Sequence, residues 1–144
     1  MEGFKISTGV IRLEIDCDGE KSIIAFNPND VNFTERFYKL FAEINEKQKE
    51  YEEKIKPLED SEFDENQMHV NVDKKIELLK EICEYFRNQI DFLFGEGTSE
   101  KVFGPSFTLE AISQFFEGIT PFIEKARNKR LDKYKKPERK NVMK

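Results

Sequence analysis

The sequence predicts a mainly helical α+β fold, in which an N-terminal antiparallel β-hairpin packs on a bundle of about three helices. The first residues alternate between apolar and polar around a turn dipeptide, as a hairpin does. Most of the remaining chain repeats its apolar residues every three or four positions, as amphipathic helices do. Fourteen Phe and no Trp among 144 residues point to one Phe-rich core, which fits a single domain.

The hairpin is expected over residues 4–26. Alternation is clearest over residues 11–15, where Ile and Leu face one way and Arg and Glu the other. Asp18-Gly19 tolerates the positive φ of a tight turn, and a return strand follows it. Since two strands alone are marginal in water, the hairpin should lie on the helices or pair with strands of another subunit.

The first helix is expected over residues 32–55, with Asp30 or Asn32 as its N-cap and an end before Pro57. Its second half keeps only one apolar residue per turn. That half should project from the core into solvent, or pack against a partner helix.

The central helix, residues 74–94, is expected to be buried, with Asp73 as its cap and Gly95 at its end. Its apolar stripe is broad enough to meet more than one neighbour. The stripe comprises Ile76, Leu79, Cys83, Phe86, Ile90, Leu93 and Phe94, flanked by Leu78, Ile82, Tyr85 and Phe92.

Two connections flank the central helix. Residues 58–71 are acidic with scattered apolar side chains, as in a partly disordered loop. Residues 95–107 form a turn, which contains one further helical turn that starts at Thr98 or Ser99 and closes at Gly104-Pro105.

A third long helix is predicted over residues 109–127, with a kink or break near Gly118-Pro121 because Pro121 lacks an N–H donor. The single domain would then span residues 1–127, and residues 128–144 would form a basic, flexible tail. From Lys125 onward the net charge is +8, which leaves −13 on the preceding residues, since the whole chain carries −5. Such a tail is either a solvated terminus or a contact for an acidic partner: another copy, a different protein or nucleic acid.

The residues argue against an enzyme, a metal site and a cofactor. His69 is the single histidine and lacks the companions that a zinc site needs. The carboxylates of residues 14–20 lack the twelve-residue calcium pattern, and residues 95–99 follow a helix without the lysine of a phosphate loop. Cys17 and Cys83 form no disulfide framework, which indicates a reducing compartment. Nucleic-acid binding by the tail is disfavoured because the acidic remainder of the chain would repel it, and no segment has the length of a membrane span.

Two stretches, FNPNDVNFTERFYKLFAEINE (26–46) and CEYFRNQIDFLFGEGTSEKVFG (83–104), resemble small proteins from the tail modules of phages and prophages of low-GC Gram-positive bacteria. That group is similar in gene position and size to tail assembly chaperones, and LFGEGTSEKVFG is the most specific part of the likeness. The resemblance implies a non-enzymatic assembly factor in the host cytoplasm. It would bind the helical tape measure protein before the tail tube assembles, and it could form a homo-oligomer.

Two other classes stay open: a small phage-encoded inhibitor of a host protein, and a structural component of the virion. If the chain holds a partner helix, its candidate residues lie on the first or the third helix, and plain core packing is the alternative for each. The candidates are Phe33, Phe37, Phe41 and Tyr51 on the first helix and Phe115, Phe116 and Phe122 on the third.

Overall fold

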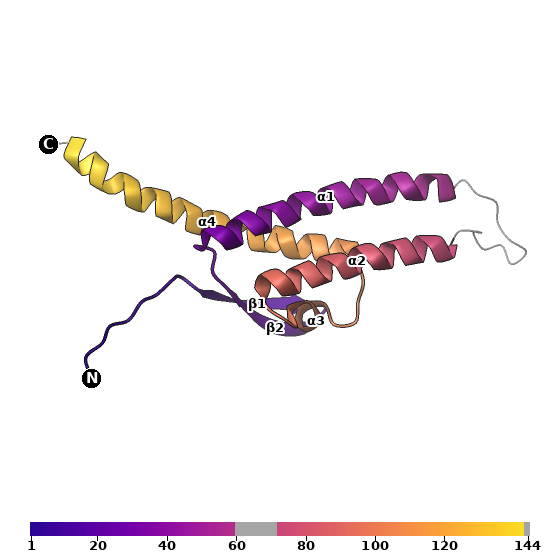
Figure 1. The fold of residues 1–144 in the computed structure, drawn as a ribbon, viewed down its shortest axis with the longest axis horizontal. Coiled ribbons are helices and arrows are strands. Elements are labelled where there is room, and N and C mark those ends of the chain that lie inside the picture. Colours follow the sequence, from indigo (N-terminus) through magenta and orange to yellow (C-terminus); the bar gives the residue numbers. More distant parts are fainter. Residues whose placement is uncertain (60–71, 143–144) are drawn as a thin grey trace, which may run out of the picture.

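The computed structural model describes residues 1–59 and 72–142, with side chains placed for residues 1–56 and 72–129. It confirms the α+β class: a two-stranded hairpin is followed by four helices (Figure 1). Their bounds are β1 Ile11–Cys17, β2 Glu20–Phe26, α1 Val31–Glu59, α2 Val72–Phe94, α3 Thr98–Phe103 and α4 Leu109–Val142. Most of the expected acidic loop, together with His69, lies outside the described residues.

The hairpin turns at Asp18-Gly19 as predicted. Both residues have positive φ, 53° and 89°, and Cys17 pairs with Glu20 across the turn. The backbone twist of such a turn matches the twist of the two strands that it joins. Residues 4–10, however, are not part of the sheet, which corrects the expected start of the hairpin. The reason is that β2 ends at Phe26 opposite Ile11, so residues 4–10 have no strand opposite them.

Helix α1 begins where a side chain caps it and ends later than expected. The Oδ1 atom of Asp30 accepts hydrogen bonds from the backbone N–H groups of Asn32 and Phe33 at 3.0 and 3.4 Å. Asp30 is therefore the N-cap rather than Asn32. The helix passes Pro57 and continues to Glu59, so the predicted end before Pro57 is wrong. In the last turn Pro57 removes only one hydrogen bond, to the carbonyl of the exposed residue Glu53.

Helix α2 starts at Val72, which places Asp73 inside its first turn instead of at the cap. The carboxylate of Asp73 still lies at the positive end of the helix dipole. At the other end Gly95 adopts φ 121° and donates its N–H to the Asp91 carbonyl at 2.9 Å, which closes the helix as its position predicted.

The core lies where α1, α2 and α4 meet the inner face of the hairpin. Phe37, Phe86 and Phe116 are fully buried within it, one from each long helix. The rings of Phe37 and Phe116 lie 5.2 Å apart and join α1 to α4. Helix α2 contacts α1, α3, α4 and β2, as its broad apolar face predicted.

Helix α4 corrects the expected flexible tail. Its backbone is helical without a break from Leu109 to Val142, so Gly118 and Pro121 do not interrupt it and the segment after residue 127 continues the helix. Figure 1 shows the axis of α4 changing direction along its length, and proline is a common cause of such bends. The extension has a simple cause: once a helix is nucleated in the core, Lys, Arg and Glu prolong it at little cost.

Candidate functional site

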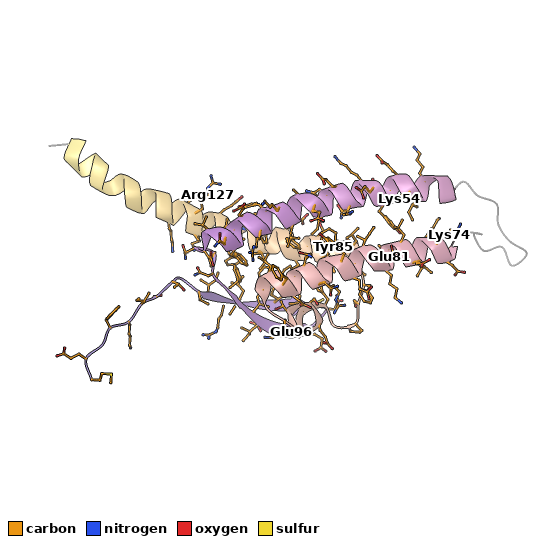
Figure 2. All side chains as sticks on the ribbon, in the orientation of Figure 1. Lys54, Lys74, Glu81, Tyr85, Glu96 and Arg127 are labelled. Carbon is orange, nitrogen blue, oxygen red and sulfur yellow. The ribbon has the colours of Figure 1, made fainter. Side chains whose placement is uncertain are left out.

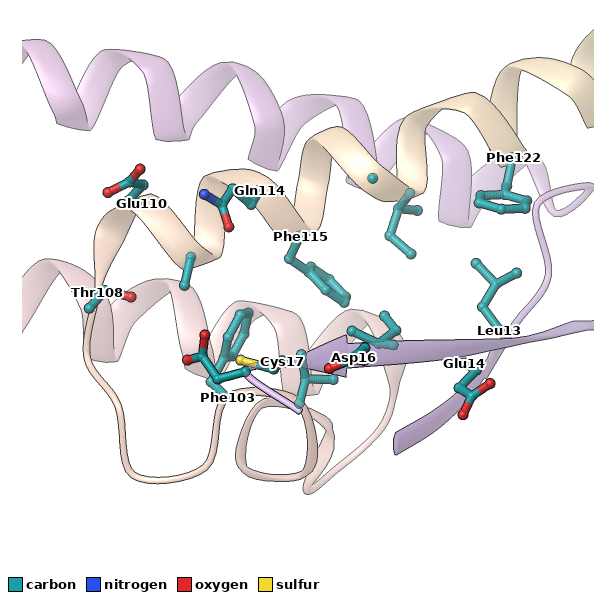
Figure 3. Close-up of a pocket in the computed structure, with 16 residues that line it drawn as sticks. Leu13, Glu14, Asp16, Cys17, Phe103, Thr108, Glu110, Gln114, Phe115 and Phe122 are labelled. Carbon is teal, nitrogen blue, oxygen red and sulfur yellow. The ribbon is translucent and has the colours of Figure 1, made fainter. Parts of the chain in front are cut away.

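Two grooves mark the surface of the described part of the chain. The strand-edge groove, of about 610 Å³, runs between β1, α3 and the first half of α4 (Figure 3). The stalk groove, of about 460 Å³, runs between α1 and α2.

The walls of the strand-edge groove are apolar. Leu13 and Ile15 come from β1, and Phe115, Ile119 and Phe122 come from α4. Figure 3 shows Leu13 and Phe122 at one end of the groove and Phe115 pointing from α4 toward the strand. Phe122 is 41% exposed although it lies among these apolar side chains.

The rim of the strand-edge groove is acidic. Glu14, Asp16, Asp18 and Glu110 line it, and no Lys or Arg is among its lining residues. The Nζ atom of Lys21 on β2 lies 3.9 Å from the Glu14 carboxylate, and both side chains are exposed. An occupant with apolar side chains and positive charge would suit this groove.

One wall of the strand-edge groove is an open sheet edge. In the antiparallel hairpin, Cys17 and Glu20 flank a two-residue turn and so form a hydrogen-bonded pair, and such pairs alternate along the strands. The backbone N–H and C=O groups of Arg12, Glu14 and Asp16 therefore point away from β2. Residues 13–18 line the groove and no residue of β2 does, so this edge faces the groove.

The segment LFGEGTSEKVFG, residues 93–104, builds the corner that carries α3 to the groove. Gly97 precedes α3 with φ 86° and supplies no side-chain cap. The cap comes instead from Asp91 on α2, whose two carboxylate oxygens accept from the backbone N–H of Ser99 at 2.7 Å and from its hydroxyl at 3.1 Å. Thr98 and Ser99 are consequently buried yet hydrogen-bonded, and Val102 and Phe103 of α3 reach the groove.

The stalk is the part of α1 after Ile44 and the part of α2 before Cys83, where the two helices run side by side past their fully buried core residues (Figure 1). Leu79 and Ile82 of this part still pack against the core cluster. Ile55 is buried in the stalk although it lies outside the core cluster. The apolar side chains of the stalk groove are Tyr51, Leu78, Ile82 and Tyr85.

The margin of the stalk groove carries charges of both signs. Lys54 on α1 and Glu81 on α2 are examples (Figure 2). The Tyr85 hydroxyl donates to the Glu43 carboxylate at 2.6 Å. This hydrogen bond, with lesser contributions from burial and from the charge of Glu43, raises the pKa of Tyr85 from 10.0 to about 12.

The structure separates the predicted partner-binding residues into buried and accessible ones. Phe33, Phe37, Phe115 and Phe116 are at most 8% exposed and belong to the core. Phe41 is partly buried against the core. Tyr51 lies in the stalk groove and Phe122 in the strand-edge groove.

Other groove residues were not singled out from the sequence. Leu78, Ile82 and Tyr85 were recognised only as flanks of the central stripe, and Leu13 and Ile15 only as strand residues. Their position on the flank of an apolar stripe could have indicated that they are accessible, because such side chains lie between a buried and an exposed face.

The described residues hold little else that suggests chemistry. Among the placed side chains of residues 1–56 and 72–129, no three of His, Cys, Asp or Glu gather as they would around a metal ion. Burial raises the pKa of the Cys83 thiol, and Arg87 offsets part of that rise, so this thiol is suited to packing. No helix in the described ranges has the length and apolar character needed to cross a membrane.

Comparison with known proteins yields one family. A family model described as "Family of unknown function (DUF6673)" matches residues 20–143, from the start of β2 to the end of α4. No curated protein and no solved structure matches the chain.

Proposed function

We propose that this chain, which belongs to the DUF6673 family of unknown function, is a non-enzymatic tail assembly factor. In this proposal it acts in the cytoplasm of a bacterial host as a chaperone of a phage or prophage tail. It binds helical segments of the tape measure protein before the tail tube assembles, and so keeps that long chain from aggregating. The resemblance of residues 26–46 and 83–104 to small tail-module proteins supports this role.

The stalk groove is the observation that carries the proposal. Leu78, Ile82 and Tyr85 follow one another at intervals of four and three on α2, so they form one continuous stripe along the helix. Tyr51 of α1 lies on the other side of the groove. A third amphipathic helix laid along two packed helices buries this kind of stripe.

The charges beside the groove also suit a helix. Glu43, Lys47, Glu50 and Lys54 follow one another at intervals of four, three and four along α1, with alternating sign. Lys47 and Glu50 pair within α1, with 3.3 Å between their Nζ and Oε2 atoms. Alternating charges that flank an apolar seam are typical of helices that pair with other helices, whereas a small-molecule pocket needs a few convergent polar groups.

Co-expression with the tape measure protein of the same phage or prophage tests the proposal. The tape measure protein should remain in the soluble fraction only when this chain is present, and the two should co-purify. Failure of the wild-type chain to solubilise or bind that protein would overturn the proposed function.

A substitution in the stalk groove locates the binding site. Leu78→Asp places a charge in the apolar stripe and should abolish co-purification. Ile76→Asp is the matched control, because Ile76 lies on the same helix, is 57% exposed and does not line the groove. Circular dichroism should show both variants folded. Equal binding by the two variants would place the partner elsewhere.

A second function, inhibition of a basic host protein, has one observation in its favour, the acidic rim of the strand-edge groove. That function predicts capture of a basic host protein that is lost at high salt. A structural virion component would instead persist in purified particles, from which a chaperone is absent.

A further inference from the structure

The first ten residues form an N-terminal arm that leaves the body of the protein (Figure 1). Phe4 is 86% exposed, Ile6 78% and Val10 58%. These residues and Thr8 alternate with other side chains along the arm, the period of a β-strand with one apolar face. An exposed apolar face of this kind is characteristic of a segment that is covered by a partner.

Specific contacts fix the place where the arm leaves the body. The side-chain amide of Asn27 donates to the carbonyl of Thr8 at 3.0 Å, and that of Asn29 donates to the carbonyl of Gly9 at 3.4 Å. Gly9 adopts φ 100°, and a Cβ atom there would collide with the Asn29 amide. The arm is therefore held at its base and directed away from the hairpin.

The strand-edge groove has backbone groups that the arm could pair with and apolar side chains that could cover its apolar face. Its open edge presents the backbone groups of alternate β1 residues, which an extended chain can pair with, and its wall presents the apolar side chains of α4. A two-stranded sheet is marginal in water, and a third strand with an apolar face would strengthen it. A helix, by contrast, could not satisfy the open edge, because its own backbone groups are already paired.

We propose that the strand-edge groove binds the N-terminal arm of a second copy of this chain, which adds to β1 as a third strand. Phe4 and Ile6 of the arm then lie in the groove against Phe115, Ile119 and Phe122. The proposal goes beyond the proposed function, because it concerns self-assembly through a different groove from the one assigned to the helical client.

The charges of the two partners agree with this pairing. Lys5 lies between Phe4 and Ile6 and so points to the opposite face of the added strand. On β1 that outer face carries Arg12, Glu14 and Asp16, all exposed, and the two carboxylates, which belong to the acidic rim, leave it net negative. Opposite charges on neighbouring strands are favourable, and no Lys or Arg lines the groove to repel the arm.

A second copy is a better occupant than the protein's own arm. The arm joins β1 directly at Ile11, so pairing with its own strand requires a reversal within residues 8–10. That reversal would break the hydrogen bonds by which Asn27 and Asn29 hold the carbonyls of Thr8 and Gly9. An arm from another copy reaches the edge without this loss.

Light scattering coupled to size-exclusion chromatography tests the proposal on the full chain without any client. The wild-type chain should elute as a dimer or larger assembly. Ile6→Asp should reduce the measured mass to the 17.1 kDa of one chain. Since Ile6 is 78% exposed in the single chain, this substitution leaves the fold intact. Val31→Asp is the matched control, because Val31 is 66% exposed but lies at the start of α1, and its assembly should equal that of the wild type.

A substitution in the groove gives a second, independent measurement. Phe122→Asp should also give single chains, because it places a carboxylate among the apolar side chains that receive the arm. Mixing it with Ile6→Asp should restore assembly, since one variant keeps an intact arm and the other an intact groove.

Several outcomes would overturn the inference. They are a wild-type chain that stays single at high concentration, an Ile6→Asp variant that assembles like the wild type, and a mixture that stays single. A wild-type monomer that Ile6→Asp destabilises would assign the groove to the protein's own arm. None of these results depends on binding of the tape measure protein, so they test self-assembly independently of the proposed function.

Discussion

The pKa of Tyr85 depends on a hydrogen bond that this residue makes beside the stalk groove. It is 39% exposed, yet its hydroxyl donates to Glu43 on the neighbouring helix at 2.6 Å. The bond favours the neutral phenol and raises its pKa from 10.0 to about 12. A raised pKa means that the stabilisation is present below pH 10 and is lost as the pH rises through about 12. The contact therefore ties α1 to α2 throughout the neutral range.

Ultraviolet titration of the tyrosines checks this contact. One tyrosine of the wild-type chain should ionise near pH 12, and Tyr85→Phe should remove that step. Glu43→Ala should lower the pH at which Tyr85 ionises toward 10, because the hydrogen-bond acceptor and its charge are both lost. Glu46→Ala, an exposed carboxylate on the same helix, should leave the titration unchanged. A step near pH 12 that survives Glu43→Ala would contradict the assignment.

At the scale of elements, the corner between α2 and α3 depends on a cap supplied from a distance. Asp91 stands eight residues before Ser99, yet it satisfies both the backbone N–H and the hydroxyl of that buried residue. Helix α3 is only six residues long and has little stability of its own. Its place beside the strand-edge groove therefore depends on this contact and on the burial of Val102 and Phe103.

Asp91→Ala should lower the free energy of unfolding by about 1–3 kcal/mol, because it leaves buried donors of Ser99 without an acceptor. Asp91→Asn keeps one carbonyl oxygen and should cost less. Urea denaturation measures both, with the exposed residue Asn88, changed to Ala, as control on the same helix. Equal losses for Asp91→Ala and Asn88→Ala would show that the cap contributes nothing.

For the whole molecule, the aromatic core is what makes one cooperative unit of hairpin and helices. Phe116 lies against Phe37, Phe41 and Phe115, with ring centroids 5.2, 6.0 and 5.8 Å away. Phe94 links the same network to Phe26 of β2 at 5.5 Å. Loss of one central ring should therefore weaken the contacts of several elements at once.

Phe116→Ala should lower the free energy of unfolding by about 3–5 kcal/mol, a large share of the stability of a small domain. Phe92→Ala is the control, because Phe92 is 70% exposed and the Arg36 guanidinium lies over its ring, 5.3 Å from the centroid. Its loss should cost less than about 1 kcal/mol. The two values come from chemical denaturation under the same conditions, and similar values would show that Phe116 does not hold the core together.

The sequence by itself determined the features that depend on neighbouring residues. The Asp18-Gly19 turn and the end of α2 at Gly95 follow from local backbone preferences, and both were predicted correctly. The helical period also predicted the apolar stripe of α2 from Leu79 to Phe94, but Ile76, its first predicted member, is 57% exposed. The wrong predictions occurred where local signals compete with packing against the rest of the chain. Proline did not end α1, and charge did not end α4, because a helix that is anchored in a core extends past weak stop signals.

Only the tertiary structure decided which apolar residues remain accessible. Phe37 and Phe41 share one helical stripe in the sequence, yet Phe37 is fully buried and Phe41 only partly so. The open edge of β1 and the acidic rim beside α4 likewise join segments about a hundred residues apart. Burial depends on which elements meet in space, and periodicity fixes only which side chains share a face.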